Sequence, residues 1–107
     1  MKLNWKPAEP EVGIGRSGSF RIAERAELPL SGNYHLEFYR EGRVYEDVWT
    51  GHVNIVEELE HGPIVVLIES FPPRGYVGGY MKWDLERRLK KTAKRVKKNF
   101  FKNSFTE

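Results

Sequence analysis

The residues best suited to chemistry are lysines and arginines crowded into one short stretch near the carboxyl end. Eight of them lie between Arg87 and Lys98, with no acidic residue among them. The segment from Met81 to Lys102 carries a charge of +8 and the rest of the chain −5, within a net charge of +3. Cationic groups at this density repel one another and attract anions, above all the phosphates of a nucleic acid. This stretch is therefore the first candidate for a binding surface.

The side chains of this stretch predict phosphate contacts with little sequence specificity, to DNA or RNA. Aromatic rings among bases can stack on nucleobases, and Trp83 and Phe101 fall on the basic side of a helical wheel. The preceding loop "PPRGYVGGY" supplies another base and two more rings. The predicted nucleic-acid-binding residues are Arg87, Lys90, Lys91, Lys94, Arg95, Lys97, Lys98, Arg74, Tyr76, Tyr80 and Trp83.

Two further roles for the basic stretch compete with nucleic-acid binding. Acidic residues elsewhere in the chain can neutralise part of the charge and leave the rest as a solvated face, which is common in thermophile proteins. A basic amphipathic helix also suits an acidic membrane surface or an acidic partner protein. Lipid insertion, however, needs an apolar face that is not already covering a sheet.

The glycines of "VGIGRSGSF" follow the pattern Gly13-x-Gly15-x-x-Gly18, which in dinucleotide-binding proteins cradles a phosphate. That use requires a strand before the loop and a helix after it. Here prolines precede the loop and a predicted strand follows it. We therefore expect this stretch to be an irregular lead-in to the first long strand. Anion binding stays an alternative, because Arg16 lies within the loop.

No motif in the chain identifies a reaction. The chain has no cysteine, which excludes disulfides, thiol catalysis and cysteine-ligated zinc. The three histidines show no metal-ligand spacing. His35 and Glu37 would share a strand face, so a metal or acid–base site needs the fold to bring a further ligand to them. We expect no catalytic residue, no cofactor and no metal, and the sequence favours a binding protein over an enzyme.

Apolar and polar residues alternate with a period of two over residues 19–71, which predicts antiparallel strands there. "YHLEFYRE" alternates most regularly, and Glu41–Arg43 predict a tight hairpin turn after it. Gly51 indicates a bulge or bend. The stretch "IVVLIESF" is apolar at both odd and even positions, which point to opposite faces of a strand. This predicts a strand covered on both faces. The expected order is an irregular lead-in (1–18), strands (19–71), a Pro/Gly loop (72–79), a basic helix (80–102) and a tail (103–107).

A long helix is the clearest predicted element. Leu85, Leu89, Thr92/Ala93, Val96 and Phe100 recur at spacings of three and four residues. At 3.6 residues per turn they span roughly 120° of the helix, the width of a core-facing stripe. The predicted fold is therefore a single α+β domain, in which an antiparallel sheet of four to five strands carries one C-terminal amphipathic helix.

This order of elements is similar to the C-terminal part of helix-grip proteins, the START-like and pollen-allergen-like folds. The similarity spans about Ser19 to Phe101 and concerns element order alone, since the first strand and the helix pair of those folds have no counterpart here. It implies an alternative function, binding of a small apolar ligand in a cavity between sheet and helix. The candidate lining residues are Phe38, Tyr45, Trp49 and Met81.

Length and composition bound the class of protein. The 107 residues suffice for one domain. No apolar run approaches the roughly 20 residues of a membrane span, and the first residues lack the apolar core of a signal peptide, so we expect a cytoplasmic protein.

The absence of glutamine with 31% charged residues is typical of thermophile proteins. An uncovered edge strand could pair with a second copy, so a homodimer is a further expectation alongside a protein–protein interaction module.

Overall fold

The protein is an antiparallel sheet with one helix laid across it. The computed structural model describes residues 1–9, 21–43, 45–72 and 78–104, with the backbone alone at 21 and 101–104. The strands are β1 (Lys6–Ala8), β2 (Arg21–Pro29), β3 (Tyr34–Arg43), β4 (Val48–Leu59) and β5 (Gly62–Phe71), and the helix is α1 (Lys82–Ser104). Neighbours in the chain are neighbours in the sheet, and all four pairings are antiparallel. The predicted α+β fold is confirmed.

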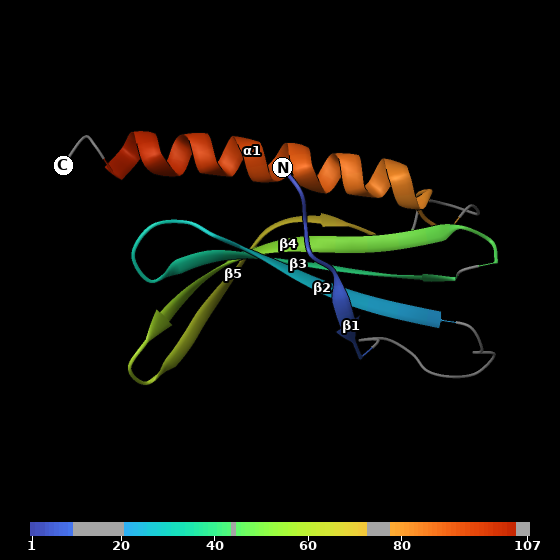
Figure 1. Ribbon diagram of the computed structural model, residues 1–107, viewed down its shortest axis with the longest axis horizontal. Coiled ribbons are helices and arrows are strands. Elements are labelled where there is room, and N and C mark those ends of the chain that lie inside the picture. The colour runs from blue at the N-terminus through green and yellow to red at the C-terminus, as the bar shows by residue number, and fades with distance from the viewer. Residues whose placement is uncertain (10–20, 44, 73–77, 105–107) are drawn as a thin grey trace.

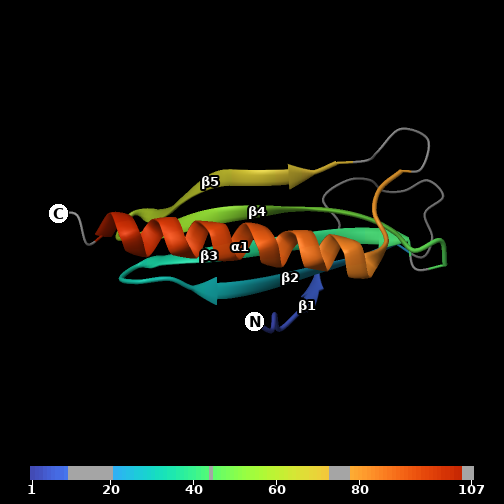
Figure 2. The ribbon, with the colours of Figure 1, turned by 90° about the horizontal axis from the view of Figure 1, so that it is seen from above.

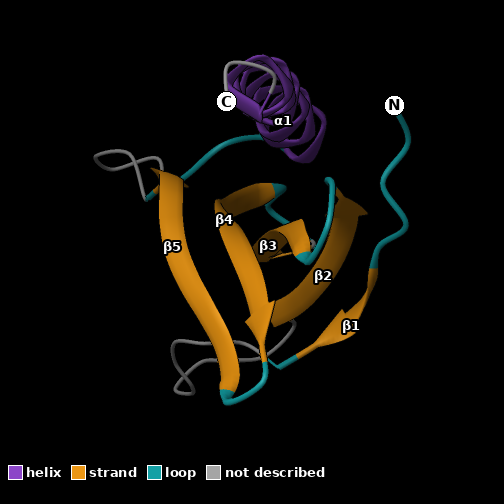
Figure 3. Cartoon of the chain, turned by 90° about the vertical axis from the view of Figure 1, so that its left-hand side faces the viewer, coloured by secondary structure: helices purple, strands orange, loops and turns teal. Residues whose placement is uncertain are grey.

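The helix lies along one face of the curved sheet (Figure 1). Viewed from above, α1 runs over β3 and β4, while β5 and β1 form the two edges of the sheet (Figure 2). Viewed along its axis, the helix sits over the hollow of the sheet (Figure 3). One face of α1 is therefore committed to the sheet and the opposite face is turned away from it.

The predicted apolar stripe of the helix is confirmed, and its side chains form the helix side of the hydrophobic core. Leu85, Leu89 and Ala93 are fully buried. They pack against the inward-facing residues of β3 and β4, among which Phe38 and Val53 are also fully buried. Removal of this much apolar area from water is the main force that holds helix and sheet together.

The hairpin turn between β3 and β4 comes later than predicted. β3 runs through Glu41–Arg43 to its end, and β4 begins at Val48. Gly42 is not part of the turn. Glycine is required there because a Cβ would meet the ring of Trp49 and the backbone of Val48, which pack against it. The turn instead contains Asp47, whose φ is 51°, a left-handed conformation that aspartate tolerates better than most residues.

Two features at β1 and β4 differ from the sequence-based expectations. Lys6–Ala8 form a short strand inside the stretch expected to be irregular; Pro7 is compatible with it because proline is tolerated in an edge strand. Gly51 does not mark the bulge, since the register of β4 against β5 shifts at Val53/Asn54. Gly51 is glycine because a Cβ would meet the carbonyl oxygen of Tyr39 and lie 3.4 Å from the Leu85 side chain.

The prediction that "IVVLIESF" is covered on both faces is wrong. These residues form β5, the last strand of the sheet, and Ile64–Leu67 are each half exposed or more. The helix lies over β3 and β4 instead, with β5 to one side of it (Figure 2). Of the residues of β5, only Phe71 is buried. Burial by the described part of the chain therefore does not account for the apolar character of Ile64–Leu67.

Candidate nucleic-acid interface

Five of the residues on the outward face of α1 lie in one band that runs along the helix. Trp83, Arg87, Lys91, Lys94 and Lys98 are spaced four, four, three and four residues apart, and all five are exposed. At 100° per residue they fall within an arc of about 80°, and at 1.5 Å per residue they extend over about 22 Å. The sequence thus aligns four cations behind one tryptophan. We call these five residues the outer stripe.

Acidic residues neutralise the cations at the amino-terminal end and on the flanks of the helix. Asp84 accepts from Arg87 at 2.7 Å and from Arg88 at 3.2 Å, and the hydrogen bond from Arg87 is the main reason why the pKa of Asp84 is lowered. Lys90 pairs with Glu86 at 3.1 Å. These two acids belong to the helix itself, so their contacts differ from the expected neutralisation by acidic residues elsewhere in the chain.

The lysines further along the helix have no such partners. Within the described residues, Lys91, Lys94, Lys97 and Lys98 make no ion pair. Lys97 is half-buried, while the other three are exposed. Their mutual repulsion is relieved by no carboxylate in this part of the structure, so a bound polyanion would relieve it.

The helix is tied to the edge of the sheet through Glu69 of β5. Its Oε1 accepts a hydrogen bond from Thr92 Oγ1 at 2.7 Å and another from Arg95 Nη2 at 2.9 Å. The Thr92 hydroxyl, followed by Arg95, lowers the pKa of Glu69 against the opposing effect of burial. Arg95 therefore has an ion-pair partner within the protein, unlike the lysines further along the helix.

Glu86 links the helix to the interior of the sheet. Burial raises its pKa, but the hydrogen bonds from Lys90 and Arg40 outweigh that effect and leave the pKa lowered. Arg40 lies 2.9 Å from Glu86 and 2.7 Å from Glu24 of β2, and its guanidinium sits 3.8 Å from the ring centroid of Trp5. Arg40 was not predicted from the sequence, although it follows Leu36 and Phe38 at every second position and so points to the same inward face of β3.

The lowered pKa values of Glu69 and Glu86 predict acid-sensitive stability. A carboxyl whose folded pKa is below its unfolded value of 4.5 stabilises the fold above that pH. This contribution is lost as pH falls through the folded pKa, because the unfolded state then binds more protons. We expect the melting temperature to decline steeply below about pH 4.5, and less steeply in Glu69→Gln.

Thr92→Val provides the matched test of this pH dependence. It keeps the shape of the side chain and removes the hydroxyl that contributes most to the shift of Glu69. Its acid transition should move to higher pH than that of the wild type. Thermal unfolding followed by circular dichroism from pH 7 to pH 3 measures both variants. Identical pH profiles for all three proteins would contradict the assignment.

The remaining predicted site residues are not all brought to the outer stripe. Tyr80 is half-buried, with its ring edge-on to Phe71 at 5.9 Å and 5.0 Å from the Arg88 guanidinium. It is thus a packing residue at the start of the helix. Arg74 and Tyr76 lie outside the described residues, as does the Gly13–Gly18 motif, and so does the side chain of Phe101.

The candidate lining residues of a ligand cavity do not surround a common space. Phe38 and Trp49 belong to the packed core, at 0% and 3% exposure. Tyr45 and Met81 are on the surface, at 79% and 54% exposure. The core side chains occupy the region between helix and sheet where that alternative function would place its ligand.

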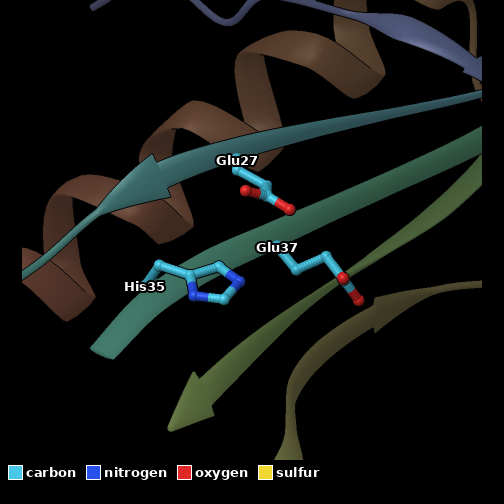
Figure 4. Close-up of side chains that lie close together, drawn as sticks. All are labelled: Glu27, His35 and Glu37. Carbon is cyan, nitrogen blue, oxygen red and sulfur yellow. The ribbon is translucent and has the colours of Figure 1, made fainter. Parts of the chain in front are cut away.

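The fold does bring a third potential ligand to His35 and Glu37. Glu27 of β2 lies opposite Glu37 of β3, and one ligand atom from each of the three side chains lies within 4.8 Å of the others (Figure 4). An imidazole with two carboxylates suits a divalent transition metal. Glu37 also accepts long hydrogen bonds from Arg25 and Asn54, both at 3.5 Å. The sequence suggested two of these residues, and only the β2–β3 register supplies the third.

Among the described residues, no helix is both long and apolar enough to cross a membrane. Comparison of the chain with protein-family models, with curated proteins and with solved structures finds no match.

Proposed function

We propose that this protein binds nucleic acid with little sequence specificity, through the outer stripe of α1. The observation that carries the proposal is the alignment of Arg87, Lys91, Lys94 and Lys98 on the face turned away from the sheet, the three lysines lacking ion-pair partners among the described residues. Successive cations are about 4.5–6 Å apart along the axis. One sugar–phosphate backbone can therefore contact several of them at once.

The chemistry of the stripe favours backbone contacts over base readout. Lysine ammonium groups are point charges that bind phosphate and carry little sequence information. Release of condensed counterions drives such association, so affinity falls steeply with salt. Trp83, at 64% exposure and 6.0 Å from the Arg87 guanidinium, presents a ring at one end of the stripe. An unpaired base could stack on it.

Fluorescence anisotropy of labelled single-stranded and duplex oligonucleotides, titrated at several salt concentrations, tests the proposal. Four phosphate contacts give a log K against log salt slope of roughly −3 to −4 on a duplex. In Lys94→Glu/Lys98→Glu we expect the slope to become shallower by about two units and the affinity at low salt to fall at least tenfold, equally for all sequences.

A matched control separates the stripe from net charge. Lys2→Glu/Lys6→Glu changes the net charge by the same amount at two exposed residues of the amino-terminal segment. It should retain most of the affinity. Equal weakening by both pairs would show that only overall charge matters, and absence of binding to any oligonucleotide at low salt would refute the proposed function.

A further inference from the structure

The two edges of the sheet are protected very differently. β1 has three residues, including Lys6 and Pro7. Short length, lysine and proline are the devices that keep an edge strand from pairing with another chain. β5 has ten residues, and from Gly62 to Ile68 it contains no charged side chain. One edge is therefore blocked, while the other has no neighbouring strand among the residues that the structure describes.

The open edge exposes apolar side chains on both faces. Ile64, Val65, Val66 and Leu67 are 50%, 53%, 51% and 58% exposed. Ile64 and Val66 lie opposite Glu57 and Ile55 and point to the helix side, whereas Val65 and Leu67 point to the other face. Alternate residues of such a strand also direct their backbone N–H and C=O groups away from β4.

We infer that β5 pairs antiparallel with β5 of a second copy of this chain, across a two-fold axis within Ile64–Leu67. A strand is the partner that satisfies both the free backbone groups and the apolar side chains on two faces. An identical strand is apolar at the same positions, so the four central residues of each copy cover those of the other.

The charges at the ends of β5 fix the direction of this pairing. In a parallel arrangement Glu69 would lie against Glu69 of the other copy, and like charges opposite one another are destabilising. In the antiparallel arrangement the Glu69 end of one copy lies beside the Gly62 end of the other, where the β4–β5 turn carries His61. The two-fold axis then places both helices on the same face of one continuous sheet.

Sedimentation velocity over a range of protein concentrations, without nucleic acid, tests this inference. We expect a reversible dimer for the wild type. Val65→Lys/Leu67→Lys places two cations on the exposed face of the edge and should give monomer at every concentration. Ile22→Lys, at a residue of β2 with 43% exposure, is the matched control and should remain dimeric. Circular dichroism verifies that each variant is folded.

Single cysteines define the register. Because the chain has no cysteine of its own, a residue near the two-fold axis changed to cysteine can form a disulfide only with the same residue of the second copy. We expect one of Ile64→Cys, Val65→Cys, Val66→Cys or Leu67→Cys to crosslink rapidly on mild oxidation, and Ile22→Cys to crosslink slowly. A monomeric wild type, a dimeric Val65→Lys/Leu67→Lys, or equal crosslinking of all five variants would overturn the inference.

Discussion

The double variant Glu24→Ala/Glu86→Ala is expected to lose about 3–5 kcal/mol of the free energy of unfolding. Both carboxylates pair with Arg40, whose side chain is only 5% exposed, between β2 on one side and α1 on the other. Removal of both partners leaves a guanidinium buried among Trp5, Trp49 and the core, with its charge uncompensated. An unpaired buried charge is among the most destabilising changes that a protein can suffer.

Urea denaturation followed by tryptophan fluorescence measures this loss. Glu58→Ala/Glu60→Ala removes two exposed carboxylates, one near the end of β4 and one in the β4–β5 turn, and should change stability by less than about 1 kcal/mol. The decisive variant adds Arg40→Met to Glu24→Ala/Glu86→Ala. It should recover much of the stability, because the charge leaves together with its partners and methionine fills similar volume. No recovery would mean that the carboxylates stabilise the fold by some other route.

The ion pairs of Arg40 also show what the sequence could not predict. Arg40 and Glu86 are 46 residues apart, and Glu69 and Arg95 are 26 apart. Their meeting depends on where the helix lies over the sheet, which periodicity does not specify. The same holds for Glu27 and Glu37, which the β2–β3 register places opposite one another.

The helix was predictable because its signal is local. Leu85, Leu89 and Ala93 recur at helical spacing, and the same spacing separates the outer stripe from the core. Two of the errors in the sheet, the hairpin turn and the covered strand, have a shared cause, since each residue pattern can arise from more than one physical requirement. Gly42 follows a turn signal but is glycine because Trp49 packs on it. Ile64–Leu67 are apolar at both odd and even positions, as in a strand covered on both faces, yet they lie in an edge strand.

Leu89→Ala is expected to lower the free energy of unfolding by about 2–5 kcal/mol. Leu89 is fully buried in the amino-terminal half of α1, and its core cluster includes Phe38 and Val53 of the sheet. Removal of its side chain leaves a cavity that rigid strands on one side and the helix backbone on the other cannot close. Urea denaturation measures the loss. Val96→Ala, at a half-buried residue of the same face, should cost about 1 kcal/mol.

The size of this loss decides which face of α1 is available to a partner. A helix that used its apolar stripe on lipid or on another protein would dock only weakly on its own sheet, and Leu89→Ala would then cost no more than Val96→Ala. A large difference between the two variants means that the stripe is committed to the core. Only the outward side chains, Trp83 and the cations aligned behind it, would then remain for binding.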